Sequence, residues 1–180
     1  YINSVQQIFA DIFKRPELFT TIFAGSAASM GIAAYANSRI VERLGTRLVS
    51  HSALLGFIAI AAVHVVISAA GHDTMWVFAI FQALTMGCFG LSSSNFGSMA
   101  MEPVGHIAGT ASSLYGSITT LLAIGIGIRI GQDYDGTLLP FATWFFLCTL
   151  ASLAVVLVVE KGRLFKPHAR AVAPGAGAET

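Results

Sequence analysis

The chain has 180 residues, of which 55% are hydrophobic and 11% are charged, and its mean hydropathy is +0.74. Soluble domains carry roughly 25% charged residues, so this composition excludes an ordinary soluble fold and indicates a membrane protein. The formal net charge of +1 gives no reason to expect a nucleic-acid partner.

The charged residues divide the chain into five uncharged runs of 21 to 28 residues. A helix needs about 20 mostly apolar residues to cross a hydrocarbon layer of about 30 Å. Strands of an outer-membrane barrel are shorter and alternate in polarity, which these runs do not. In lipid a helix also satisfies every backbone amide within its own segment. The sequence therefore predicts an all-α integral membrane protein with about five transmembrane helices, near residues 18–38, 48–71, 74–99, 107–129 and 137–159.

The segment before the first run, Tyr1–Phe13, has apolar residues at helical spacing but is too short to span a membrane. We expect either the end of a preceding membrane helix or a short interfacial helix. The first residue is not Met, and no charged region with a cleavage site precedes the segment, so we expect a fragment without a signal peptide.

Short polar segments separate the runs and indicate how the chain turns. Gly71–Asp73 and Asp133–Gly136 predict turns on one side of the membrane. Glu102–Pro103 breaks the helix on the other side, because Pro lacks an amide donor and restricts the residue before it. The last stretch, residues 167–180, is rich in Ala, Gly and Pro and predicts a disordered tail on the cytoplasmic side.

The distribution of Lys and Arg predicts the orientation, since short cytoplasmic loops carry an excess of both. Only Lys14, Arg15 and Arg129 fall on one side. The other side has seven basic residues: Arg39, Arg43, Arg47, Lys161, Arg163, Lys166 and Arg170. We therefore expect the amino end outside and the carboxyl end in the cytoplasm. An odd number of spans agrees with this, because it places the two ends on opposite sides of the membrane.

The runs at 74–99 and 107–129 contain polar residues at helical spacing, whereas the run at 137–159 is almost bare of them. Such residues serve either as packing contacts between membrane helices or as the lining of a polar path. On the second interpretation seven residues line a solute cavity: Gln82, Thr85, Phe89, Ser113, Ser117, Thr120 and, from the first run, Ser29.

Titratable residues within the runs are few. His64 is the one well inside a run, where it is either a buried neutral side chain or part of a proton relay. Cys88 and Cys148 suit neither a disulfide framework nor a zinc site, so we expect no metal and no cofactor. The sequence has no G-x-S-x-G or H-E-x-x-H motif, and we expect no enzyme. An intramembrane serine hydrolase built on Ser117 remains a remote alternative.

Two polar loops resemble a known family. The segment Ser38–Arg47 is similar to the G-x-L-a-D-R-x-G-r-R loop of the major facilitator superfamily, in its second copy between helices eight and nine. Three positions match the motif: Arg43, Gly45 and Arg47. Four positions differ from it: Ser38 for Gly, Ile40 for Leu, Glu42 for Asp, and Thr46 for the first basic residue of the closing pair.

The segment Met101–Gly116 is the more specific one. It resembles the E-P-x-x-H-x-A-G-T-A-S stretch between helices ten and eleven of Bcr/CflA-type multidrug:proton antiporters. Eight residues match: Glu102, Pro103, His106, Ala108, Gly109, Thr110, Ala111 and Ser112.

The resemblance covers nearly the whole chain and implies the end of helix seven and helices eight to twelve of a twelve-helix transporter. In that fold helices seven, eight, ten and eleven line the central cavity, while nine and twelve face lipid. The resemblance also implies gating loops on the cytoplasmic side, formed here by Glu42, Arg43, Gly45, Arg47, Glu102 and His106.

Residues and resemblance together predict proton-coupled efflux of small amphipathic drugs or metabolites by alternating access. The partners would be the small-molecule substrate, protons, the lipid of a bacterial inner membrane and the missing amino-terminal half of the transporter. The alternative is a membrane scaffold or assembly subunit that transports nothing. The upstream sequence distinguishes the two, because only the transporter needs six further spans.

Overall fold

A computed structural model describes residues 2–162 and 164–165 of the chain. This part of the chain contains helices and turns but no strand, which confirms the all-α prediction. The chain begins with three short helices: α1 (Ile2–Gln7), the π-helix η1 (Ile8–Ile12) and the 3₁₀ helix η2 (Pro16–Leu18). The long helices follow, with a short 3₁₀ helix between the third and fourth: α2 (Phe19–Leu44), α3 (Thr46–Ala69), α4 (Met75–Met101), η3 (Glu102–Ile107), α5 (Ala108–Gln132) and α6 (Leu139–Val159).

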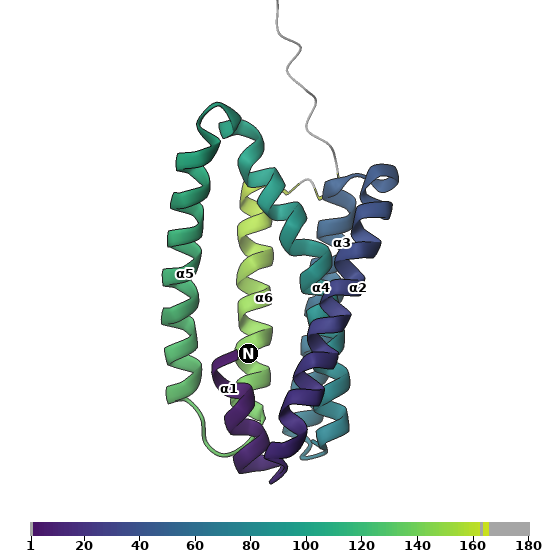
Figure 1. Cartoon of the computed structure of the whole chain (residues 1–180), viewed down its shortest axis with the longest axis vertical. Helices are drawn as coiled ribbons and strands as arrows, with labels where there is room; N and C mark the ends of the chain where they lie inside the picture. Colours follow the sequence, from purple (N-terminus) through teal and green to yellow (C-terminus); the bar gives the residue numbers. More distant parts are fainter. Residues whose placement is uncertain (1, 163, 166–180) are drawn as a thin grey trace, which may run out of the picture.

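Four helical stretches are long and apolar enough to cross a membrane: Pro16–Leu44, Thr46–Ala69, Met75–Gln132 and Leu139–Val159. The third is 58 residues long because it joins α4, η3 and α5, and the chain reverses direction at η3 (Figure 1). The protein is therefore a membrane-embedded helical bundle. The predicted tail at 167–180 lies outside the described residues, as do Arg163, Lys166 and Arg170.

Some helices extend beyond the predicted spans, because a helix need not end where the hydrocarbon ends. α2 continues past residue 38 to Leu44 and carries the exposed side chains of Arg39, Glu42 and Arg43 on its last turns. Gly45 alone separates α2 from α3, with a φ of +81° that favours glycine.

The α3–α4 and α5–α6 turns lie at one end of the bundle, and η3 lies at the opposite end (Figure 1). The α3–α4 turn contains Gly71 and ends at Thr74, whose Oγ1 accepts a hydrogen bond from the amide of Val77 at 3.2 Å and so caps α4. In the α5–α6 turn the Asp135 carboxylate accepts hydrogen bonds from the amide and hydroxyl of Thr137, at 2.9 and 2.7 Å. The hydroxyl bond first and then the amide bond hold the pKa of Asp135 below its usual range.

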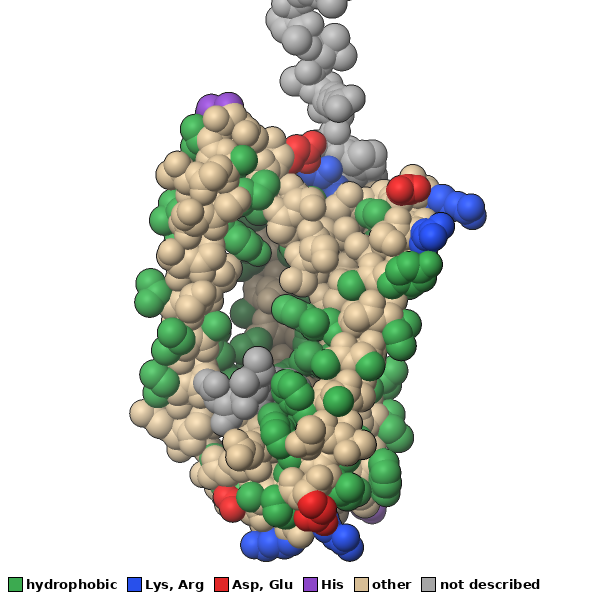
Figure 2. Space-filling model, viewed as in Figure 1, with side chains coloured by type: hydrophobic (Ala, Val, Ile, Leu, Met, Phe, Trp, Pro, Cys, Tyr) green, Lys and Arg blue, Asp and Glu red, His purple; other side chains and the backbone are tan. Residues whose placement is uncertain are grey.

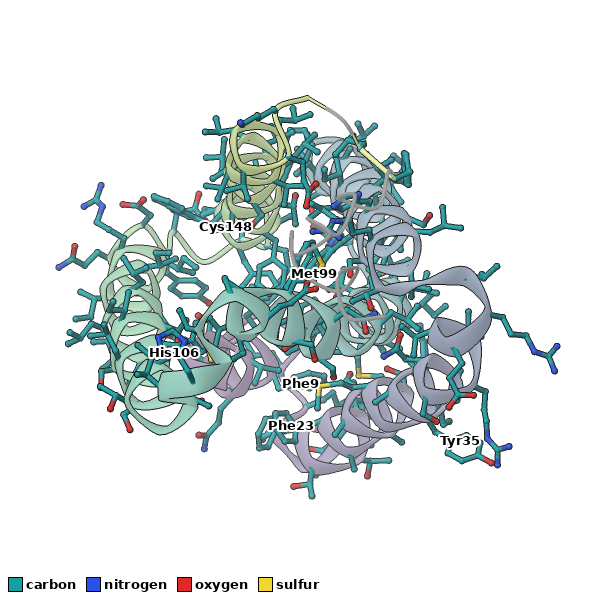
Figure 3. The ribbon with its side chains drawn as sticks, turned by 90° about the horizontal axis from the view of Figure 1, so that it is seen from above. Phe9, Phe23, Tyr35, Met99, His106 and Cys148 are labelled. Carbon is teal, nitrogen blue, oxygen red and sulfur yellow. The ribbon has the colours of Figure 1, made fainter. Side chains whose placement is uncertain are left out.

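α4 is the central helix and packs against both α2 and α3, while α3 packs against α6. A cluster of buried apolar residues joins the start of the chain to α4, α5 and α6: Val5, Ile8, Phe9, Phe78, Ile130, Leu138 and Phe141. Seen from above, Phe9 lies inside the bundle, whereas Tyr35 points away from it (Figure 3). Val5, Ile8 and Phe9 thus belong to the packed core of the fold.

α5 stands apart from the other long helices (Figure 1). Ile130, near one end, is its one buried residue. The space-filling view shows a hollow between α5 and the rest of the molecule (Figure 2). Because α5 is uncovered along most of its length, this side of the bundle is open in the described structure.

Candidate functional site

α2 and α4 meet along a polar seam that holds several residues predicted from the sequence. The Oγ of Ser29 lies 2.7 Å from the carbonyl oxygens of both Ser26 and Ala83, so its single proton can satisfy either helix. Toward the carboxyl end of α2 the side chains of Asn37 and Asn95 are buried and exchange two amide hydrogen bonds, at 3.2 and 2.8 Å. The structure therefore places Ser29 in a helix–helix contact.

The Asn pair gives a testable prediction about this seam. We expect Asn37→Ala to destabilise the folded protein by about 1–2 kcal/mol, because it leaves the buried amide of Asn95 without its cross-helix partner. The double variant Asn37→Ala/Asn95→Ala should cost less than the sum of the two single changes. Equilibrium unfolding in bicelles measures all three, and strictly additive costs would contradict the pairing.

The structure separates the predicted cavity residues of α4. Gln82 and Thr85 are 1% and 3% exposed, whereas Phe89 is 46% exposed. Thr85 donates its hydroxyl proton to the Gln82 carbonyl at 3.0 Å, and the buried Nε2 of Gln82 has no hydrogen-bond partner among the described residues. In this structure Gln82 and Thr85 are interior residues of the bundle.

The predicted residues of α5 lie on an uncovered surface. Ser113, Ser117 and Thr120 are all exposed. Ser113 donates its hydroxyl proton to the Gly109 carbonyl at 3.0 Å, and Ser117 donates to the Ser113 carbonyl at 2.8 Å. At about 100° per residue, these three residues with Gly109 and Gly116 occupy an arc of about 100° on the helix. We call this set of five residues the polar arc of α5.

At the end of the bundle where α2 meets α3, Arg47 and Glu160 form a partly buried ion pair that links α3 to the end of α6. Arg47 Nε lies 3.0 Å from Glu160 Oε1, and the two side chains are 23% and 4% exposed. A nitrogen–oxygen distance of 3.0 Å with this burial makes a charge-assisted hydrogen bond that water screens little. We call this contact the inner latch, because the distribution of Lys and Arg predicts that this end of the bundle faces the cytoplasm.

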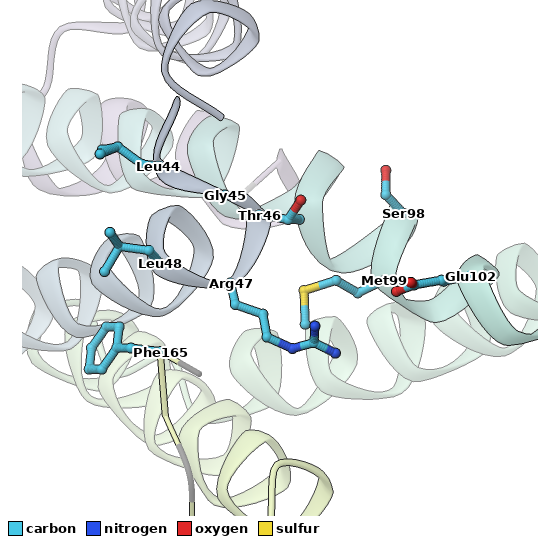
Figure 4. A pocket seen from close by; sticks show the side chains of 9 residues that line it. All are labelled: Leu44, Gly45, Thr46, Arg47, Leu48, Ser98, Met99, Glu102 and Phe165. Atoms are coloured by element: carbon cyan, nitrogen blue, oxygen red, sulfur yellow. The ribbon is translucent and has the colours of Figure 1, made fainter. Parts of the chain in front are cut away.

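A cavity of about 480 Å³ adjoins the inner latch (Figure 4). Residues from four segments line it: Leu44, Gly45, Thr46, Arg47, Leu48, Ser98, Met99, Glu102 and Phe165. Three of the six predicted gating residues, Gly45, Arg47 and Glu102, are therefore brought together here. Figure 4 shows Arg47 extending from α3 toward Met99 and Glu102.

The other three predicted gating residues are not part of this cavity. Glu42 and Arg43 are exposed and border a shallow hollow on the outer side of α2. His106 is exposed in η3, at the end of α5 (Figure 3). Glu42, Arg43 and His106 form no ion pair with another described residue.

Sequence reasoning missed Glu160 and His51 as members of the inner site. His51 is 1% exposed, and its Nδ1 accepts a hydrogen bond from the amide of Phe165 at 3.1 Å. The Phe165 ring lies against the imidazole with its centroid 5.6 Å away. The sequence signal for Glu160 was its position directly after the last apolar run, because a carboxylate near the membrane boundary is usually paired with a cation.

The comparisons with known proteins add no family to this description. Neither family models, nor curated proteins, nor solved structures give a match to the chain.

Proposed function

We propose that this chain is part of an alternating-access transporter that exports small amphipathic drugs or metabolites in exchange for protons. The uncovered polar arc of α5 is the observation that carries the proposal, because hydroxyl groups and glycines gather there on a surface that the other described helices leave exposed. If this surface faced lipid, its hydroxyl groups would form no favourable interactions with the hydrocarbon chains. Facing a second set of helices across a path, it can bind polar parts of a solute.

The inner latch supplies a second support for the proposal. Alternating access requires contacts at one end that form in one state and break in the other. A charge-assisted contact between α3 and α6, beside a cavity lined by Glu102, is suited to this role. The excess of basic residues at this end supports its placement in the cytoplasm of a bacterial cell, with the amino end outside.

A cysteine-blocking experiment on the full-length transporter tests the proposal. With Cys88 and Cys148 replaced by Ala, we expect Ser117→Cys to remain active and a bulky thiol reagent to reduce efflux of an amphipathic cationic dye at least about tenfold. Leu122→Cys is the matched control, since Leu122 is 60% exposed on the same helix and lies outside the polar arc.

Equal inhibition at both positions, or at neither, would contradict a path along the polar arc. An uncovered arc of small residues also suits packing against another membrane protein, which is the scaffold alternative. In that case the full-length protein would show no dye efflux, and a reagent at Ser117 would release a bound partner.

A further inference from the structure

We propose that His64 and Asp73 form a proton-binding site at the end of the bundle opposite the inner latch. His64 lies on α3, one and a half turns before the helix ends, and Asp73 lies in the α3–α4 turn. The Nε2 atom of His64 is 3.8 Å from Oδ1 of Asp73. That distance is too long for a hydrogen bond but short enough for an ion pair once the imidazole is protonated.

The Nε2 atom of His64 faces a carboxylate and would form an ion pair with it if it bound a proton. It is 4% exposed, and its Nε2 is buried without a hydrogen-bond partner among the described residues. A buried polar atom without a partner is costly, and a proton on Nε2 would be directed at the carboxylate. In the step we propose, a hydronium ion transfers one proton to Nε2, which leaves water and an imidazolium ion paired with Asp73.

Two neighbours of His64, Asp73 and Phe81, offset part of the cost of burying an imidazolium ion. Phe81 of α4 stacks on the ring, with centroids 4.8 Å apart and planes 10° apart, and an aromatic face attracts a cation. Phe78, also on α4, lies 6.3 Å away. Among the described residues, Asp73 is the one carboxylate with an oxygen within 4.0 Å of an imidazole nitrogen of His64.

Asp73 can pair with the charged imidazole and also reaches water, from which the proton comes. Ser68 donates its hydroxyl proton to Asp73 Oδ1 at 3.0 Å, which fixes the same oxygen that faces His64. The Asp73 side chain is 16% exposed, so it connects the buried imidazole to the aqueous side of the turn. Proton uptake would tie the turn to α3 and so couple the outer end of the bundle to external pH.

Nuclear magnetic resonance of the histidine nitrogens in nanodisc-reconstituted protein tests the site directly. The chain has five His residues, and loss of one signal in His64→Gln assigns His64. We expect His64 to change from imidazole to imidazolium as the pH is lowered from neutral to about 4. Asp73→Asn, which preserves an acceptor for Ser68, should reduce the proton affinity of His64 about tenfold. His72→Gln, in the same turn but exposed, is the matched control and should leave it unchanged.

An imidazole that stays neutral down to about pH 4, or an affinity that Asp73→Asn leaves unchanged, would overturn the inference. Only the coupling of this proton to export rests on the proposed function. A protein that exports dye while His64 stays neutral refutes the proton site and leaves the proposed function standing. Titration of His64 that depends on Asp73 supports the site even in a protein that exports nothing.

Discussion

Arg47→Gln is expected to destabilise the folded protein by about 3 kcal/mol, because it removes the guanidinium beside a carboxylate that is 4% exposed. Glu160→Gln should cost less, since Arg47 is 23% exposed and its charge can reach water. The double variant Arg47→Gln/Glu160→Gln should cost less than the two single changes together, because it removes both charges of the pair at once. Reversible unfolding in bicelles gives the three free energies.

The matched control is the exposed ion pair Arg15–Glu17, whose side chains are 65% and 58% exposed at 3.6 Å. Arg15→Gln should change the free energy of unfolding by less than about 1 kcal/mol. Equal costs at Arg15 and Arg47, or strict additivity in the double variant, would contradict the inner latch as a buried contact.

Gly90→Ala is expected to separate α2 from α4 and to destabilise the protein by about 2–3 kcal/mol. A Cβ atom at Gly90 would lie 2.5 Å from the carbonyl oxygen of Met30 and 3.1 Å from Met30 Cγ. The side chain of Met30 can move, but its backbone carbonyl cannot without shifting α2. Such a shift would also strain the contacts of Ser29 and Asn37 with α4.

Gly87→Ala on the same helix is the matched control, since a Cβ there meets nothing within 4 Å. Ala has the higher helix propensity, so we expect this change to be neutral or to stabilise by up to about 1 kcal/mol. The two substitutions thus have opposite expected signs. A neutral Gly90→Ala would show that the close α2–α4 approach does not exist in the membrane.

The helices could be predicted from the sequence because their causes are local. A long uncharged run has to be helical in lipid, and Gly71 or Glu102–Pro103 interrupts it whatever the neighbouring helices do. The end of α2 was less predictable. Its last charged turns are solvated and can remain helical past the hydrocarbon boundary, so Leu44 and not residue 38 is its last residue.

The environment of each polar face could not be predicted, because periodicity defines a face but not what covers it. Gln82 and Thr85 share one face of α4, as Ser113 and Ser117 share one face of α5, because residues three or four apart lie on the same side of a helix. The structure buries the first pair and leaves the second uncovered. The inner latch was equally hidden, since Arg47 and Glu160 are 113 residues apart in sequence. Only the packing of α3 on α6 brings them together.

The orientation of the bundle decides which side of the membrane the inner latch and the proton site face, and cysteine labelling in intact cells tests it most directly. With Cys88 and Cys148 replaced by Ala, single cysteines at Glu42 and His72 report on opposite ends of α3, and both positions are exposed. We expect a membrane-impermeant thiol reagent to label the His72→Cys variant from outside the cell and to label Glu42→Cys only after the membrane is opened. Labelling of both from the same side would contradict the account.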